Sequence, residues 1–133
     1  MGPLKPAFAA RFRMLSTTIL ACYWLAMFLG THWPNFKLEQ YPQNTDKVLH
    51  LSAYAGLSFL IAVRLSLKRD LRLSDSLWIL AAIVGYSIFD EVTQPPFGRT
   101  CDFFDAVADW VGGIFGLCAF AVLRRMLRRI ASA

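Results

Sequence analysis

Four apolar segments, each near the length of a membrane-spanning helix, are the main constraint on the fold of this chain. They cover roughly residues 14–30, 48–67, 77–92 and 106–127. About 20 mainly apolar residues in a helix cross a bilayer, and a helix satisfies its backbone hydrogen bonds within one segment. The chain has 133 residues, of which 56% are hydrophobic, so it has room for one domain. The sequence therefore predicts an all-α fold, a four-helix transmembrane bundle that forms a single domain over residues 1–133.

The first apolar segment follows Arg11 and Arg13, as the apolar core of a signal peptide would. It ends near Gly30 without the small residues that mark a cleavage site, and more apolar segments follow. We therefore expect an uncleaved first span.

Basic residues are sorted between alternate links of the predicted bundle. Eleven of the 14 Lys and Arg residues precede the first segment, join the second to the third, or follow the fourth. Because cytoplasmic loops are enriched in Lys and Arg, we expect both termini in the cytoplasm and a multi-pass protein of the inner membrane. A net charge of +5 without a basic, aromatic-rich stripe favours this explanation over nucleic-acid binding, and we expect no nucleic-acid partner. The basic C-terminal segment either binds anionic lipid headgroups or serves only as a topology anchor.

Carboxylates gather at the opposite borders of the apolar segments. Seven of the nine lie there: Glu39, Asp46, Asp90, Glu91, Asp102, Asp105 and Asp109. Three of them, Asp46, Asp102 and Asp105, fall at expected helix starts, where an acid favours the positive end of the helix dipole. Helix capping therefore accounts for these three.

Asp90 and Glu91 close the third segment, where capping offers no such explanation. Two acids at a helix C-terminus oppose the helix dipole, and they are costly near hydrocarbon unless paired or protonated. This favours a functional use. The competing explanation is an ion pair with Arg99 or Lys47.

Two further helix faces carry polar side chains toward the same border. Asp46, His50 and Tyr54 are spaced i, i+4, i+8 at the start of the second segment, so they share one face. A single buried histidine is more often a structural hydrogen-bonding residue than a catalyst.

Asp102, Asp105 and Asp109 share one face at the start of the fourth segment. Gly112 and Gly116 continue that face as a GxxxG pair, which allows close helix approach in a bilayer. We expect this pair to serve packing within the bundle rather than dimerisation. The sequence leaves the oligomeric state open.

The order of these motifs resembles the VanZ-like family of small bacterial multi-span membrane proteins. The resemblance covers roughly residues 46–116. It rests on Asp46, Lys47, His50 and Tyr54, on Asp90, Glu91 and Gln94, and on Gly98, Arg99 and Asp105. Where the family often has Asn, this chain has Asp109, which adds a charge. The family takes its name from a protein associated with low-level teicoplanin resistance. The resemblance implies a multi-span membrane protein but supplies no reaction.

We predict an outward-facing polar and acidic site in the membrane protein. Its predicted ligand-binding residues are Lys47, His50, Tyr54, Asp90, Glu91, Gln94, Arg99, Asp105 and Asp109. The expected function is to bind or modulate a lipid, a lipid-linked cell-wall precursor or a glycopeptide-type antibiotic, with membrane lipids as partners. Arg99 would bind phosphate or carboxylate, and the acids would attract cations.

A membrane-embedded enzyme acting on a lipid-linked substrate is the alternative. His50 would be its general base and Asp90 or Glu91 its acid, or His50, Glu91 and Asp105 would hold a divalent metal. No nucleophile motif or phosphate-binding loop supports catalysis. We assign no metal ligands, and the cofactor stays open. A third possibility is a structural role, in which ion pairs lock the helices together.

Overall fold

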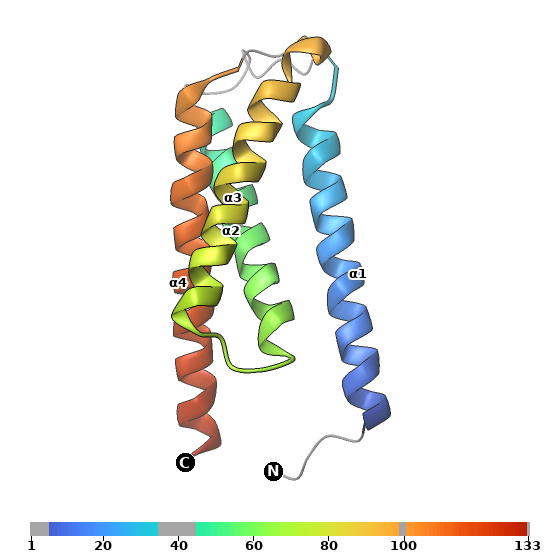
Figure 1. Cartoon of the computed structure of the whole chain (residues 1–133), viewed down its shortest axis with the longest axis vertical. Helices are drawn as coiled ribbons and strands as arrows, with labels where there is room; N and C mark the ends of the chain where they lie inside the picture. The colour runs from blue at the N-terminus through green and yellow to red at the C-terminus, as the bar shows by residue number, and fades with distance from the viewer. Residues whose placement is uncertain (1–5, 35–44, 99–100, 133) are drawn as a thin grey trace.

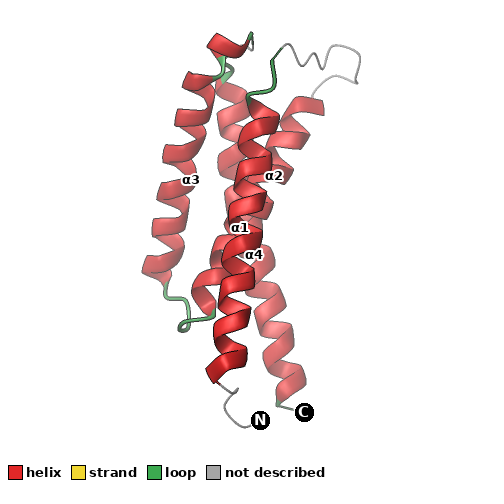
Figure 2. Cartoon of the chain, turned by 90° about the vertical axis from the view of Figure 1, so that its right-hand side faces the viewer, coloured by secondary structure: helices red, strands yellow, loops and turns green. Residues whose placement is uncertain are grey.

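The computed structural model describes residues 6–34, 45–98 and 101–132. They form the helices α1 (Pro6–Thr31), α2 (Thr45–Ser66), α3 (Leu73–Thr93) and α4 (Phe103–Ala131), with a short 3-10 helix, η1 (Pro95–Phe97). No strand occurs in these ranges, which confirms the all-α class (Figure 2). We call one end of the bundle the terminal end, where α1 begins, α4 ends and the α2–α3 link lies (Figure 1). The other is the η1 end, where η1 and the starts of α2 and α4 lie.

Each of the four long helices contains a stretch that is long and apolar enough to cross a membrane. Large apolar side chains such as Trp78, Leu73 and Met14 are mostly exposed, as expected of surfaces that face lipid. The four predicted spans are thus confirmed as helices of the required length and composition. Their orientation across the bilayer stays a prediction.

Polar helix ends explain why the predicted apolar segments are shorter than the helices. α3 begins at Leu73 because Asp75 accepts a hydrogen bond from the Arg72 backbone N–H over 2.8 Å, which satisfies a donor of the first turn. α4 continues to Ala131, and its last turn carries Arg128 and Arg129 where cations suit the negative end of the helix dipole. An apolar window detects neither of these polar turns.

Close approach of α2 and α4 depends on two glycines. A Cβ atom at Gly112 would overlap the backbone carbonyl of Leu51, and one at Gly116 would overlap the carbonyl of Ala55 and the hydroxyl of Ser58. The GxxxG pair therefore serves packing within the chain, as predicted. This contact sets the distance between the polar faces of the two helices near the η1 end.

α1 is attached mainly to α2. Tyr23 Oη donates a hydrogen bond to the Ala53 carbonyl over 2.9 Å, and Arg64 Nε donates to Thr17 Oγ1 over 2.6 Å. α3 is held against α4 by Trp110 Nε1, which donates to Ser87 Oγ over 2.7 Å. Toward the terminal end α1 diverges from α3 (Figure 1).

Candidate functional site

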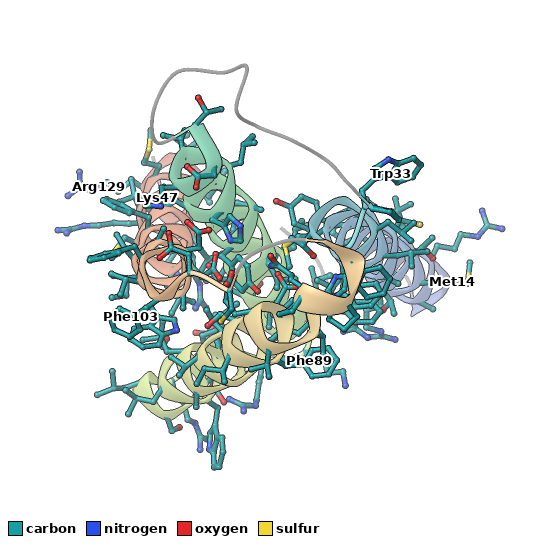
Figure 3. All side chains as sticks on the ribbon, turned by 90° about the horizontal axis from the view of Figure 1, so that it is seen from above. Met14, Trp33, Lys47, Phe89, Phe103 and Arg129 are labelled. Carbon is teal, nitrogen blue, oxygen red and sulfur yellow. The ribbon has the colours of Figure 1, made fainter. Side chains whose placement is uncertain are left out.

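Buried polar side chains from all four long helices meet near the η1 end. We call this group the polar cluster: His32, His50, Tyr54, Asp90, Glu91, Gln94, Asp105 and Asp109. Every member is at most 6% exposed. In the view from above, oxygen atoms gather between the helices, whereas the labelled Phe89 and Phe103 lie on the outside (Figure 3). Near the η1 end, polar side chains thus lie between the helices, while Phe89 and Phe103 face the exterior.

The structure brings most of the predicted ligand-binding residues together. Lys47, His50, Tyr54, Asp90, Glu91, Gln94, Asp105 and Asp109 all lie in or beside the polar cluster. Arg99 lies outside the described residues, so its predicted role in anion binding stays a prediction. That these residues bind a ligand also stays a prediction at this point.

His50 joins α2 to α4. Its Nδ1 donates to Asp109 Oδ1 over 3.0 Å, and its Nε2 lies 3.9 Å from Asp105 Oδ2. Because Nδ1 carries the donated proton in this arrangement, a neutral imidazole presents a basic Nε2 to the rest of the cluster. The contact orients the ring as an acid–base group would need.

Lys47 lies at the edge of the cluster among three carboxylates. Its Nζ is 3.0 Å from Asp102 Oδ2, 3.1 Å from Asp105 Oδ1 and 3.4 Å from Asp46 Oδ2. Its positive charge is therefore already shared by acids of the helix starts. The sequence analysis considered Lys47 as an ion-pair partner of Asp90 or Glu91. In the structure Lys47 pairs with these other three carboxylates instead.

Asp102 caps α4, as the sequence analysis expected. Its Oδ1 accepts from the Phe104 backbone N–H over 2.8 Å, and its own N–H donates to Glu91 Oε2 over 2.9 Å. The backbone hydrogen bond from Phe104, followed by the contact with Lys47, holds the pKa of Asp102 below its ordinary value. The start of α4 is thus capped by the Asp102 side chain and is also hydrogen-bonded to α3.

Replacing the cap is expected to make α4 less stable in a pH-dependent way. Asp102→Ala should lower the free energy of unfolding by about 1 kcal/mol at pH 7, and Asp102→Asn by less, because Asn also caps helices. The lowered folded-state pKa means that the carboxylate stabilises fully above its unfolded-state pKa and loses this effect as the pH falls through the folded-state pKa. The stability difference between the wild type and Asp102→Asn should therefore shrink below about pH 4. Unfolding by dodecyl sulfate, followed by circular dichroism across a pH series, measures it; a difference that stays constant contradicts the assignment.

Neutral donors hold the two acids that close α3. Asp90 Oδ1 accepts from Thr31 Oγ1 over 2.9 Å. Gln94 Nε2 lies between the two carboxylates, 3.5 Å from Asp90 Oδ2 and 3.4 Å from Glu91 Oε1. No Lys or Arg pairs with either acid among the described residues. Their negative charge is therefore available to an incoming cation or hydrogen-bond donor.

Thr31 and His32 on α1 complete the site, and the sequence analysis missed both. His32 is 6% exposed; its Nδ1 donates to the Phe28 carbonyl over 3.0 Å, and its Nε2 lies 2.8 Å from Thr93 Oγ1. The available signal was the position of a His at the same border as His50.

Two polar atoms of the cluster have no hydrogen-bond partner among the described residues. They are Tyr54 Oη and Asp109 Oδ2, and both side chains are fully buried. Leaving such a group unpaired typically costs about 1–3 kcal/mol. Both atoms are therefore suited to interact with the polar part of a ligand.

One set of cluster residues has the spacing of a metal site. His50, Glu91 and Asp109 each offer a ligand atom, and these atoms lie within 4.8 Å of one another. Imidazole and carboxylate ligands suit several divalent metals. The metal site considered from the sequence used Asp105 as its third ligand. The structure places Asp109 there instead. A second acidic set, at Asp46, Asp102 and Asp105, surrounds the ammonium group of Lys47 and so already contains a cation.

An apolar groove lies between α1, α2 and α3 on the terminal side of the cluster. Its volume is about 410 Å³, and its lining includes Leu20, Trp24, Leu57 and Tyr86. Tyr86 is one helical turn before Asp90, and its ring packs 5.8 Å from that of Tyr54. The groove therefore leads to the polar cluster.

Comparison with known proteins agrees with the geometry at the level of family. A model of the family described as VanZ/LLP1 matches residues 6–124. This match includes α1 with Thr31 and His32, and it extends beyond the resemblance found from motifs. The chain is thus a multi-pass membrane protein by family and by its four apolar helices. No match was found among curated proteins or among solved structures.

Proposed function

We propose that this chain, which belongs to the VanZ/LLP1 family, is a membrane module that binds an amphiphile bearing an amine. The apolar chain of the ligand would lie in the groove between α1 and α3, and its head would lie at the polar cluster. One observation carries the proposal: the apolar groove leads directly to the polar cluster, because Tyr86 of the groove packs against Tyr54 of the cluster.

The groove favours a ligand that comes from the membrane. Its lining is almost entirely apolar, and it lies where α1 diverges from α3. Hydrogen bonds of Thr31 with Asp90 and of His32 with Thr93 hold the ends of these helices together near the η1 end. The rings of Trp24 and Tyr86 meet at the groove itself. Because lipid tails are as apolar as the groove, moving a tail into it gains little free energy. Selectivity must therefore come from the head of the ligand.

The charge of the cluster favours a cationic head. Asp90, Glu91 and Asp109 are buried, and the cation at the edge, Lys47, is already shared by three other carboxylates. An amine donates three hydrogen bonds, which suits carboxylates and the unpaired Asp109 Oδ2. Amine-bearing lipids, lipid-linked cell-wall precursors and glycopeptide-type antibiotics share this chemistry. In the predicted orientation the site faces outward, where each of them is encountered in the cell envelope.

A membrane-embedded enzyme is a second candidate, and the His50–Asp109 contact favours it. A carboxylate that accepts from Nδ1 leaves Nε2 as the basic atom, so His50 could remove a proton from a substrate hydroxyl or amine. Asp90 or Glu91 would then return a proton to the leaving group. This candidate acts on the same class of lipid-linked substrate.

Binding can be tested by native mass spectrometry of the full-length protein in detergent. The probes are a long-chain alkylamine and the alkanol of equal chain length, neither of which carries a phosphate. We expect the amine to be retained and the alkanol to be released, and we expect Asp90→Asn to weaken amine retention about tenfold, which corresponds to about 1.4 kcal/mol. Asp70→Asn, which removes a carboxylate at the terminal end, is the charge control and should bind as the wild type does.

A matched pair of variants tests the groove. Ala82 lines it and the neighbouring Ala81 is exposed outside it, so Ala82→Trp should abolish retention and Ala81→Trp should not. Equal retention of both probes, or equal effects of the two Trp variants, contradicts the binding proposal. Incubation with extracted membrane lipids separates the candidates. A new covalent lipid species that His50→Ala abolishes supports the enzyme, and unchanged lipid masses contradict it.

A further inference from the structure

A second groove lies at the terminal end, far from the polar cluster along the helices. Its volume is about 610 Å³, and it lies between the start of α3 and the last turns of α4. α4 extends past the start of α3 toward the terminal end, so the groove is bounded by both helices and the α2–α3 link (Figure 1). It shares no residue with the groove between α1 and α3.

The lining of this groove is strongly basic. Its charged members are Arg72, Arg124, Arg125, Arg128 and Arg129, and no carboxylate is among the lining residues. Nearby, Asp70 pairs with Arg124 and Arg128, and Asp75 pairs with Arg69. Within the described ranges, Arg72, Arg125 and Arg129 make no ion pair with a carboxylate. Three guanidinium groups, one from the α2–α3 link and two from α4, therefore line one groove without an ion-pair partner among the described residues.

The inner wall of the groove is apolar. Leu117, Phe120 and Ala121 of α4 and Leu73 of α3 form it, while Ser76 and Ser132 add hydroxyl groups. The apolar wall suits an acyl chain, and the cationic rim suits a lipid head that carries a phosphate. Planar guanidinium groups bind phosphate through paired hydrogen bonds.

We infer that this groove binds an anionic phospholipid of the leaflet at the terminal end, with its phosphate among Arg72, Arg125 and Arg129 and an acyl chain along Leu117 and Phe120. Charge complementarity carries the choice of ligand, and the apolar wall favours a lipid over a free anion. The basic C-terminal segment then does more than mark topology, because Arg72, at the end of the α2–α3 link, belongs to the same site. Binding would also link the start of α3 to the end of α4.

The test uses native mass spectrometry of the full-length protein with phosphatidylglycerol and phosphatidylcholine of identical acyl chains. We expect phosphatidylglycerol to be retained in preference. The triple variant Arg72→Gln, Arg125→Gln, Arg129→Gln should weaken that retention by at least about tenfold. The control triple variant Arg11→Gln, Arg13→Gln, Lys68→Gln removes the same charge from the same end but outside the groove. It should bind as the wild type does.

A second pair of variants keeps every charge. Ala121→Trp fills the groove, and Val122→Trp places the same ring on a neighbouring exposed residue outside it. Only Ala121→Trp should weaken retention. Circular dichroism and gel filtration verify that each variant is folded.

Three results would overturn the inference. The first is an equal loss in the two triple variants, which would mean an effect of surface charge alone. The second is unchanged binding in Ala121→Trp. The third is displacement of the lipid by an equal concentration of inorganic phosphate, which would show that the acyl contacts contribute nothing. Because the alkylamine probes carry no phosphate, failure here leaves the proposed function unaffected, and the reverse also holds.

Discussion

Gly116→Leu is expected to force α2 away from α4 and to destabilise the bundle. Any Cβ at this position overlaps the Ala55 carbonyl and the Ser58 hydroxyl, and the backbone atom cannot move without shifting α2. Overpacking a tight contact commonly costs about 1–3 kcal/mol, and overlap with a backbone atom places this variant at or above that range, at about 3 kcal/mol. The midpoint of unfolding in dodecyl sulfate, followed by circular dichroism, measures the loss.

The same substitution at Gly85 is the matched control. Gly85 lies within the membrane-spanning α3, and a Cβ there has no atom within 4 Å. Gly85→Leu should therefore leave the midpoint close to that of the wild type. If the two variants are equally stable, α2 and α4 do not approach each other as closely at Gly116 as described.

Asp109→Leu is expected to lower both the stability of the bundle and its binding of the alkylamine probe. It removes the acceptor of His50 Nδ1 and leaves a buried donor unpaired, which should cost about 2 kcal/mol. Binding of the alkylamine probe should be lost as well, because Asp109 Oδ2 faces no other partner among the described residues. Asp109→Asn can still accept from His50, so it should retain most of the stability.

The double variant His50→Leu, Asp109→Leu decides between structural and functional roles of this pair. Replacing both partners of a buried polar pair by apolar groups is often neutral or stabilising. We expect the double variant to recover most of the stability lost in Asp109→Leu, whereas amine binding stays lost. If binding returns together with stability, the pair serves only to hold α2 and α4 together.

Spacing along single helices could be predicted from the sequence, whereas the partners across helices could not. Spacing predicts that His50 and Tyr54 share one face of α2. It also predicts that Asp109 shares one face of α4 with the acids before it. Which faces meet depends on how closely the helices cross, which the carbonyl groups beside Gly112 and Gly116 determine. The sequence also offered Lys47 as a partner for Asp90 or Glu91. The structure places it with Asp46, Asp102 and Asp105 instead, because all four lie near the starts of the adjacent helices α2 and α4.

The contribution of α1 required the tertiary structure. Thr31 and His32 lie at the end of a helix with no acidic motif of its own, so only the position of a His at the same border as His50 marks them in the sequence. They join the polar cluster because α1 ends at the level where α3 ends. That places Thr31 within 2.9 Å of Asp90 and His32 within 2.8 Å of Thr93.

The sequence by itself determined the helices, the membrane class and the end of the bundle at which the acids gather. These follow from apolar length, helix capping and alternation of charge, which are properties of neighbouring residues. Only the tertiary structure decided that Asp109 pairs with His50, that a groove leads to Tyr54, and that Arg72 joins the arginines of α4. The physical reason is that such contacts depend on the distance and rotation between helices. Those are set by glycine packing and by which helices diverge, and no single segment encodes them.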